Sequence, residues 1–379
     1  MAGGAAWLLA ALAVGSGVYC VLVLFAVWDF RRPRRHRAGN PPLLPLSVLK
    51  PLSGLDEGLE GNLRSFFEQD YPSFELLFAI RSEADPAATV VRSLIAEYSH
   101  VPASLLIVGE PPWENAKVWS LHQMTSRAQS EVLVMSDSDI RVTPGFLAAV
   151  ASEFQDPKLG VSSCLYRAVA GRSLPSTLEA VGMNTEFLSG VLVARVVEGV
   201  KFALGPTLTA RRKAIADVGG WAELAGFLAE DFVLGNRAAN RGWRVILSDA
   251  VVEHRIGSQP WRANAGHRLR WFRSTRRSRP SGYVGQLFTN PLPLVLLAWA
   301  AVPEWWLVYA VVLALRGAAA VATAGFVVQD WKTLRRPWLI VIQDLLSFAF
   351  WIAGFFGNTV RWRGQSYELL SDGRFRRAD

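Results

Sequence analysis

Long apolar segments near both ends of this chain enclose a middle part in which short apolar and amphipathic segments alternate. The apolar segments are 5–27, 287–302, 305–328 and 338–356. A bilayer crossing needs ~20 apolar residues, so we predict membrane helices at both ends. The segment 287–302 is short and interrupted by proline, which is typical of a re-entrant segment or of one arm of a tight hairpin.

The middle part begins with four short apolar segments separated by amphipathic ones. The predicted strands are 46–50, 74–80, 104–109 and 131–137, and the predicted helices are 56–70, 86–99 and 118–129. This alternation predicts an α/β fold with a parallel sheet. In open sheets of this kind, ligands bind at the carboxyl ends of the strands.

The pattern is less regular further along the chain. We predict strands at 161–167, 202–210 and 244–249, and helices at 176–199, 211–221 and 230–243. The segment 261–280 is rich in Arg and also contains Trp and Phe, which predicts a helix lying flat on a membrane. The predicted domains are a transmembrane anchor (1–30), a basic, Pro-rich linker (31–45), an α/β domain (46–255), an interfacial segment (256–286), a transmembrane region (287–358) and a basic tail (359–379).

Composition and charge support this division. The 379 residues are 51% hydrophobic, which fits an ordinary water-soluble domain joined to membrane segments. Part of the net charge of +8 lies in 31–37, directly after the first apolar segment, and no Lys or Arg precedes that segment. The positive-inside rule then places the chain after Arg31 in the cytoplasm. Cys20 and Cys164 are far apart and predict no disulfide framework, as in a reducing compartment.

Two carboxylates follow the fourth predicted strand. Asp137 and Asp139 are spaced i, i+2, so they point to the same side of an extended chain. Two carboxylates this close repel each other unless a cation lies between them. Mg²⁺ or Mn²⁺ prefers such oxygen ligands together with substrate phosphates. A solvated turn, or a helix N-cap before Pro144, would explain the same residues without a metal.

Three other segments carry candidate chemistry. Asp231 follows Glu230 at the start of a predicted helix and could take a proton from a hydroxyl acceptor; stabilising the helix N-terminus is the alternative. Lys117 begins another helix, where a phosphate would bind well, although an ordinary surface lysine would look the same. In "HRLRW" (267–271), Arg can bind a diphosphate and Trp can stack on a sugar or lipid. Contact with anionic lipid head groups is the alternative there.

From about Leu46 to Trp271, with its flanking membrane segments, the chain resembles the membrane-bound, ceramide glucosyltransferase-like glycosyltransferases. The resemblance rests on five segments in this order: "VLKPLSGLDEGLEGNLRSFFEQDYPSFELLFAIRSEADPA", "NAKV", "SDSDIRV", "LAEDFVLGNRAANRGWR" and "HRLRW". It implies a GT-A fold, which is a Rossmann-like α/β glycosyltransferase domain, with flanking transmembrane helices, an interfacial helix and a nucleotide-sugar donor.

The resemblance also implies roles for single residues. Asp137 would bind the metal and the diphosphate, assisted by Asp139. Asp231 would be the general base. Arg270 and Trp271 would belong to the (Gln/Arg)-x-x-Arg-Trp motif that closes over the site.

Two positions depart from the family pattern. Ser82 stands where the family has its first Asp, so we expect Glu83 or Asp85 to contact the nucleotide instead. His267 stands where the closing motif has Gln or Arg, and this detail resembles the hopanoid-associated glycosyltransferases. We expect His267 and Lys117 among the residues that bind the nucleotide sugar.

The sequence therefore predicts an inverting glycosyltransferase in a multi-pass membrane protein, with its catalytic domain on the cytoplasmic face. It would move a hexose, with glucose the first choice, from a UDP-sugar to the hydroxyl of a membrane lipid such as ceramide, with Mg²⁺ or Mn²⁺ as cofactor. Within this class, the acceptor could be a hopanoid or another lipid. A processive polysaccharide synthase usually needs more membrane helices than this chain offers.

Readings from other classes explain less of the sequence. A haloacid-dehalogenase-type phosphatase would use Asp137 as nucleophile and Asp139 as acid, but Arg141 stands where that class needs Thr or Val. A transporter or a membrane-tethered nucleic-acid binder would not depend on a divalent metal, and a nucleic-acid binder would show strongly salt-dependent binding. We expect no nucleic-acid partner.

Overall fold

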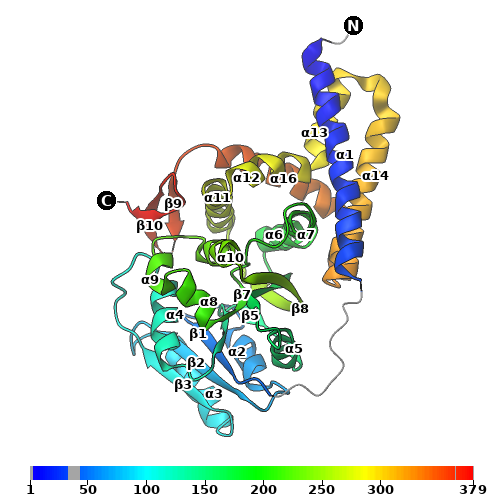
Figure 1. The fold of residues 1–379 in the computed structure, drawn as a ribbon. Coiled ribbons are helices and arrows are strands. Elements are labelled where there is room, and N and C mark those ends of the chain that lie inside the picture. Colours follow the sequence, from blue (N-terminus) through cyan, green and yellow to red (C-terminus); the bar gives the residue numbers. More distant parts are fainter. Residues whose placement is uncertain (1–2, 33–42, 363, 379) are drawn as a thin grey trace. The chain divides into compact units, whose positions relative to one another are not determined.

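The computed structural model describes residues 3–32, 43–362 and 364–378, and the chain forms two compact units (Figure 1). The sheet unit consists of Arg35–Val169, Val200–Gly257 and Tyr367–Asp379. The helical unit consists of Met1–Arg34, Ala170–Gly199 and Ser258–Ser366. Most of the predicted linker 31–45 lies outside the described residues.

An eight-stranded mixed sheet forms the centre of the sheet unit. Its strands are β1 (Leu46–Pro51), β2 (Phe74–Ile80), β3 (Ala103–Ile107), β4 (Val132–Ser136), β5 (Ile140–Arg141), β6 (Leu159–Ala170), β7 (Thr207–Arg211) and β8 (Arg244–Ile256), in the order β3-β2-β1-β4-β7-β6-β8-β5. The parallel pairing predicted for the first four strands is confirmed. Beyond β4 the pairing changes, because β7 runs antiparallel to β4 and β6 runs antiparallel to β7. The carboxyl end of β4 therefore lies near the middle of the sheet, beside that of β1.

Helices connect these strands and share their core. They are α2 (Leu59–Phe67), α3 (Ala87–Glu97), α4 (Ala116–Arg127), α5 (Phe146–Glu153), α8 (Arg212–Asp217), α9 (Gly220–Leu224) and α10 (Glu230–Asn240). Leu121 of α4, Leu133 of β4 and Leu234 of α10 belong to one buried hydrophobic cluster. This shared core brings the first turns of α4 and α10 towards the same end of β4. Near the C-terminus, β10 (Gln365–Leu369) pairs antiparallel with β11 (Phe375–Arg377).

The helical unit contains the apolar segments. Its elements are α1 (Gly4–Phe30), α6 (Leu174–Gly182), η1 (Met183–Phe187), α7 (Leu188–Val197), α11 (Trp261–Ser278), α12 (Pro280–Gly285), η2 (Gln286–Thr289), α13 (Pro291–Ala301), η3 (Pro303–Trp305), α14 (Trp306–Ala320), η4 (Val321–Val327), α15 (Trp331–Leu334), α16 (Trp338–Gly354) and β9 (Thr359–Trp362). The segments η1 and η4 are π-helical, and η2 and η3 are 3₁₀-helical.

Among the described residues, three helices are long and apolar enough to cross a membrane: Gly4–Phe30, Leu174–Val197 and Pro303–Val327. The proline-interrupted segment, predicted to be re-entrant or part of a hairpin, lies in the helix pair Pro280–Thr289 and Pro291–Ala301. The two helices of this pair bend by 63° at the break between them. If the pair crosses the membrane as one span, it is the fourth candidate span of the described residues. The segment Ala170–Gly199 was predicted to be part of the α/β domain 46–255, but in the structure it belongs to the helical unit. This segment lies in the helical unit because it is apolar around much of its surface.

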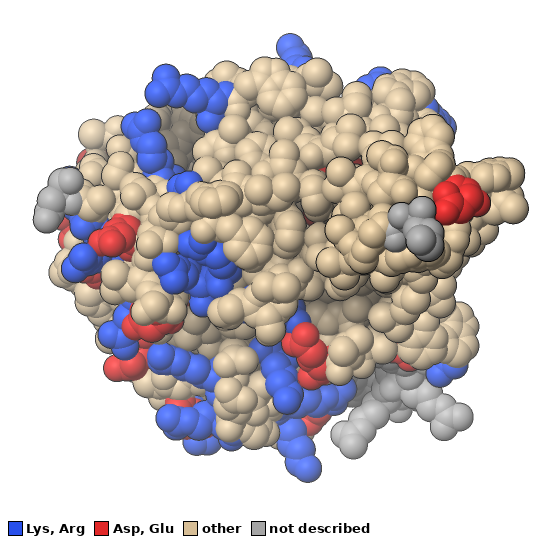
Figure 2. All heavy atoms as spheres, turned by 90° about the horizontal axis from the view of Figure 1, so that it is seen from above, with Lys and Arg blue, Asp and Glu red and all other residues tan. Residues whose placement is uncertain are grey.

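Large apolar side chains lie exposed on the helical unit. Those of Trp28, Trp306, Trp338 and Phe356 are each more than half exposed. Seen from above, uncharged residues cover a broad area beside separate groups of Lys and Arg (Figure 2). A surface of this kind is costly in water and is typical of a lipid-facing one with Trp near its ends.

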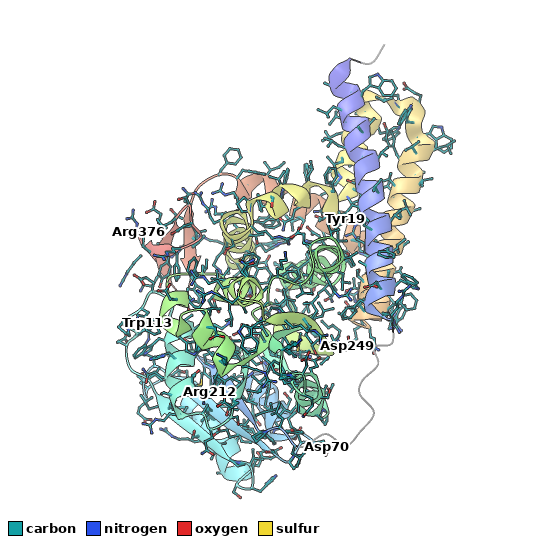
Figure 3. The ribbon with its side chains drawn as sticks, in the orientation of Figure 1. Tyr19, Asp70, Trp113, Arg212, Asp249 and Arg376 are labelled. Carbon is teal, nitrogen blue, oxygen red and sulfur yellow. The ribbon has the colours of Figure 1, made fainter. Side chains whose placement is uncertain are left out.

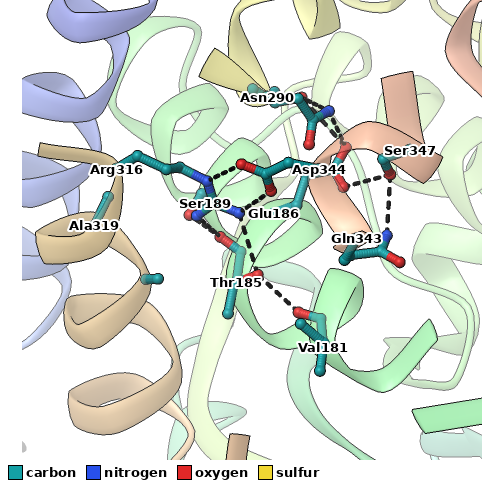
Figure 4. A network of polar contacts seen from close by, with 12 residues as sticks. Val181, Thr185, Glu186, Ser189, Asn290, Arg316, Ala319, Gln343, Asp344 and Ser347 are labelled. Carbon is teal, nitrogen blue, oxygen red and sulfur yellow. Dashed lines mark hydrogen bonds and ion pairs between the residues drawn. The ribbon is translucent and has the colours of Figure 1, made fainter. Parts of the chain in front are cut away.

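Between the helices of this unit lies a buried polar group of residues, which we call the Arg316 cluster (Figure 4). Arg316 of α14 forms two hydrogen bonds with the carboxylate of Asp344 of α16, at 2.7 and 3.0 Å. Glu186 of η1 accepts hydrogen bonds from Ser347 at 2.5 Å and from Asn290 at 2.8 Å. The cluster thus joins α14, α16, η1 and the break before α13.

Candidate active site

Lys117 is the centre of the predicted site in the sheet unit. Its ammonium group lies 2.8 Å from Asp137 Oδ1 and 3.1 Å from Glu230 Oε1, and it donates to the carbonyl of Gly205 at 3.4 Å. Asn115 caps the first turn of α4 and also donates to Glu230 Oε2 at 3.3 Å. Lys117 is therefore not an ordinary surface lysine. Burial by itself lowers its pKa, but the facing carboxylates outweigh burial and raise it above its ordinary value.

The loop before α4 is anchored on aromatic side chains. Trp113 (Figure 3) packs edge-on against Trp119, with 5.2 Å between the ring centroids. The indole N–H of Trp119 donates to the carbonyl of Val108, at the end of β3. These contacts fix the start of α4, and with it the position of Lys117.

Asp137 follows β4 directly, and its main-chain carbonyl is held by Lys50 of β1. The Lys50 side chain is fully buried, and its ammonium group donates to the carbonyl of Asp137 at 2.5 Å and to Ser136 Oγ at 3.3 Å. The N–H of Asp137 donates to the carbonyl of Pro206 at 3.0 Å. Burial lowers the pKa of Lys50 to about 7 against the attraction of Asp137 and Asp139. The main chain of Asp137 is thus fixed, while its carboxylate stays one-third exposed.

Asp139 turns towards β8. Its Oδ2 lies 3.1 Å from His254 Nε2, and this contact lowers the pKa of Asp139 although burial alone would raise it. Its Oδ1 is buried and has no hydrogen-bond partner in the part of the chain that the structure describes. A buried carboxylate oxygen of this kind is able to accept a further ligand.

Asp231 lies at the start of α10, close to Gly205. A Cβ added to Gly205 would lie 2.7 Å from Asp231 Oδ2, so a larger residue there would displace the carboxylate. Another glycine, Gly235, lets α10 pack directly against the backbone of Phe202 and Ala203, since a Cβ there would lie 2.3 Å from the Ala203 nitrogen. The two glycines together place the Asp231 carboxylate beside the loop that also contacts Lys117.

The Asp231 carboxyl has a strongly perturbed acidity. Burial first, and then the negative charge of Glu230, raises its pKa from 3.8 to about 7, against the attraction of Lys117. Asp137 adds to this rise, which means that the two aspartates act on each other within one site. The sequence alone left open whether Asp137 and Asp231 meet, and in the structure both lie around Lys117.

The charge balance and the ligand set fit a divalent cation. Among the described residues of this site, the carboxylates outnumber the lysines: Asp137, Asp139, Glu230 and Asp231 against Lys117 and Lys50. No group of three or more His, Cys, Asp or Glu side chains in the described chain could hold a metal ion alone. Mg²⁺ is commonly bound by one or two carboxylates together with substrate phosphates, so the unpartnered Oδ1 of Asp139 and the exposed part of Asp137 suit that arrangement.

The two acidic residues after β2 are engaged elsewhere. Glu83 forms an ion pair with Arg92 of α3 on the surface. Asp85 accepts N–H groups from Gly54 at 3.0 Å and from Ala87 at 3.0 Å, which ties the start of α3 to the loop after β1. Their predicted contact with the nucleotide stays a prediction.

The "HRLRW" residues lie on α11, in the helical unit. His267 Nδ1 lies 3.0 Å from Glu179 Oε1, and the Arg270 guanidinium lies 6.0 Å from the centroid of the Trp362 ring. Arg268 is buried and donates to Gln343 Oε1 at 3.2 Å, so its charge serves the fold. The binding roles predicted for His267, Arg270 and Trp271 stay predictions.

Sequence reasoning missed several members of the Lys117 site. Glu230 was noticed only as the neighbour of Asp231, and Asn115, Lys50 and His254 were not singled out. For Asn115 the available signal was its position as N-cap immediately before a predicted helix. For Lys50 the signal was a lysine inside a strand that is otherwise apolar, since a buried lysine needs polar partners.

Comparison with solved structures defines the class. The mannosyltransferase PcManGT from Pyrobaculum calidifontis, in complex with GDP-Man and Mn²⁺, has a TM-score of 0.55 and 19% identity, covering 92% of this chain and 97% of that one. This likeness concerns the fold, which is a glycosyltransferase fold of the GT-A type. More specifically, the chain belongs to glycosyl transferase family 21, whose model matches residues 6–375.

Curated relatives carry related names. Ceramide glucosyltransferase 1 of Caenorhabditis elegans is 31% identical over 235 residues, which are 62% of this chain and 50% of that protein. The ceramide glucosyltransferase of Komagataella phaffii is 32% identical over 140 residues, which are 34% of this chain and 28% of that protein. The matched part thus spans half the length of the first relative and less than a third of the length of the second.

Proposed function

We propose that this chain is an inverting glycosyltransferase that transfers a hexose, glucose being the first choice, from a UDP-sugar to the hydroxyl of a membrane lipid such as ceramide. One observation carries the proposal: Asp137 and Asp231, more than ninety positions apart in the sequence, lie around the partly buried Lys117 in a GT-A sheet. Membership of family 21 and the names of the relatives support the choice of a lipid acceptor. The haloacid-dehalogenase alternative has no support from this fold.

The residues divide the reaction between acid–base and electrostatic roles. Asp231, with a pKa near 7, takes the proton from the lipid hydroxyl as its oxygen attacks the anomeric carbon. The bond from that carbon to the diphosphate breaks, and UDP leaves with the bonding electron pair. Because this is a single displacement, the configuration at the anomeric carbon inverts. A carboxylate that is half protonated near neutral pH is well matched to this role.

Lys117 and the strand-end aspartates serve the departing diphosphate. The Lys117 ammonium group lies next to Asp137, where negative charge accumulates on the leaving group, and its position is already fixed before reaction. Asp137 and Asp139 would hold Mg²⁺ or Mn²⁺. The metal would supply Lewis-acid stabilisation of the diphosphate. Lys50 keeps the main chain of Asp137 in place throughout.

The helical unit would give the acceptor access from the bilayer. Its exposed apolar side chains and its three long apolar helices support a multi-pass membrane protein. The basic residues after the first helix favour a cytoplasmic position for the sheet unit. Ceramide, a hopanoid and another lipid remain separate acceptors for the assay, and three or four candidate spans in the described chain favour a lipid product over a polysaccharide.

The test is Asp231→Asn, assayed by mass spectrometry of lipid products formed from several UDP-sugars and lipids. We expect kcat to fall by about 10²–10⁴-fold, because Asn cannot take the hydroxyl proton. Asp249→Asn, at an exposed position of β8 (Figure 3), is the matched control and should keep wild-type activity. Near-normal transfer by folded Asp231→Asn protein would remove Asp231 from the mechanism.

A further inference from the structure

Glu179 of α6 is a buried carboxylate that contacts α11 with both oxygens. Its side chain is 2% exposed. One oxygen lies 3.0 Å from His267 Nδ1, and the other accepts a hydrogen bond from the side-chain amide of Asn264. Asn264 and His267 are three positions apart on α11 and therefore lie on one face of that helix. A carboxylate bound at two such points resists rotation of α11 about its own axis.

The constraint reaches Trp271 through His267. The two rings are four positions apart on α11, and their centroids are 4.6 Å apart with an angle of 56° between the planes. A ring packed this closely limits the rotamers available to its neighbour. Glu179, His267 and Trp271 thus form a continuous line of contacts, all within the helical unit.

A second contact holds the same helix from α16. Arg268 is 5% exposed, donates to Gln343 Oε1 at 3.2 Å and to Ser347 Oγ at 3.4 Å, and lies 4.7 Å from the Phe350 ring centroid. Two consecutive residues of "HRLRW" are therefore fixed by different neighbours. Arg270 and Trp271 are each partly exposed and follow directly after these fixed points.

We infer that Glu179 is a positioning residue, which acts through His267 to hold Trp271 in the orientation needed for glycosyl transfer. The inference rests on the proposed function and on the sequence prediction that Trp271 belongs to the motif that closes over the sugar nucleotide. It gives His267 a role other than direct binding of the donor. It also gives a reason for a buried carboxylate on an apolar helix, where an unpartnered charge would be costly.

The activity test is a double-mutant cycle with Glu179→Ala and Trp271→Ala in the full-length protein. We expect Glu179→Ala to lower kcat by about 10–100-fold, because small displacements of a closing group are costly, with little change in KM for the lipid. In the Trp271→Ala background, Glu179→Ala should have almost no further effect. Equal factors in both backgrounds would overturn the inference.

Conservative variants separate positioning from folding. His267→Gln can still donate to Glu179 and should keep most of the activity, whereas His267→Ala should resemble Glu179→Ala. Glu179→Gln keeps the size and the contact with Asn264, and should fall between Glu179→Ala and the wild type. Glu304→Ala, an exposed position of the same unit, is the matched control and should behave as the wild type. A His267→Gln variant as inactive as His267→Ala would contradict the inference.

A spectroscopic test does not depend on activity. The chain contains 15 Trp residues, which can be replaced by 5-fluorotryptophan, and Trp271→Phe assigns the Trp271 signal in the ¹⁹F spectrum. We expect Glu179→Ala to shift or broaden this signal, and Glu304→Ala to leave it unchanged. An unmoved Trp271 signal would overturn the inference even if transfer is observed. If the wild type transfers no sugar, the proposed function fails, while this measurement still tests the contact line.

Discussion

The two buried polar clusters of this protein differ in how their charges are balanced. In the Arg316 cluster, one cation meets the carboxylate of Asp344 in two short hydrogen bonds, and the two side chains are 6% and 2% exposed. In the sheet unit, Lys117 lies among several carboxylates, and the pKa of Asp231 is raised to about 7. The Arg316 guanidinium is thus paired with one carboxylate among the apolar helices, whereas carboxylates are in excess where we propose that a substrate and a metal bind.

This difference has a physical reason. A charge buried among apolar helices is tolerated only when a partner satisfies it completely, so Arg316 has a structural role. An excess of carboxylates destabilises the apo fold but creates affinity for a cation and a base of suitable pKa.

The largest effect is expected for Arg316→Met. The substitution leaves Asp344 buried without its partner, which costs about 3–5 kcal/mol of folding free energy. Thermal unfolding of the protein in lipid nanodiscs measures this loss. The double variant Arg316→Met with Asp344→Leu should recover much of the stability. A single variant that is as stable as the wild type but inactive would make the Arg316 cluster a functional site.

The same substitution at Lys117 should separate activity from stability. Lys117→Met removes the cation that faces the leaving diphosphate, and we expect kcat/KM to fall by about 10²–10³-fold. The unfolding temperature should change less than in Arg316→Met, because Asp137 is one-third exposed and its carboxylate can be hydrated or protonated. Loss of folding comparable with Arg316→Met would remove the contrast between the two clusters.

Glu230→Gln should shift the pH profile. Glu230 raises the pKa of Asp231, so removing its charge lowers that pKa. A general base works only when deprotonated, and the acid limb of kcat/KM should therefore move to lower pH. Glu223→Gln, on α9, is the control and should leave the limb in place. An unshifted limb in Glu230→Gln would mean that another group determines it.

The smallest effect concerns the stability of Asp231→Asn. The pKa of Asp231 is higher in the folded chain than its ordinary value of 3.8, so the folded state binds more protons than the unfolded state between about pH 4 and 7. Wild-type stability then falls as the pH rises through this interval. At pH 8, without divalent metal, Asp231→Asn should be more stable by about 1 kcal/mol, or about 2–4 °C. The difference should vanish near pH 4, and a less stable Asn variant at pH 8 would contradict it.

Much of the fold could be predicted because it depends on local patterns. The strands β1 and β4 are buried along their whole length and are mostly apolar, as central parallel strands require, and Asp137 directly follows β4. The N-terminal apolar segment was long enough to indicate a membrane helix by length alone. The segment 176–199 was predicted as a helix, but its apolar surface did not reveal that it lies in the helical unit.

The hydrophobic periodicity of the sequence was enough to predict many of the helices and strands, because it depends on which side of each element is buried, but it did not predict α5, β5 or the strands β9 to β11. Only the tertiary structure decided that Lys117 lies between Asp137 and Glu230, and that Glu179 holds His267. These partners are 20 to 113 positions apart in the chain. Their meeting depends on how helices pack on the sheet or on one another, and on glycines such as Gly205 and Gly235 that permit close approach. A local pattern carries no information about such distances.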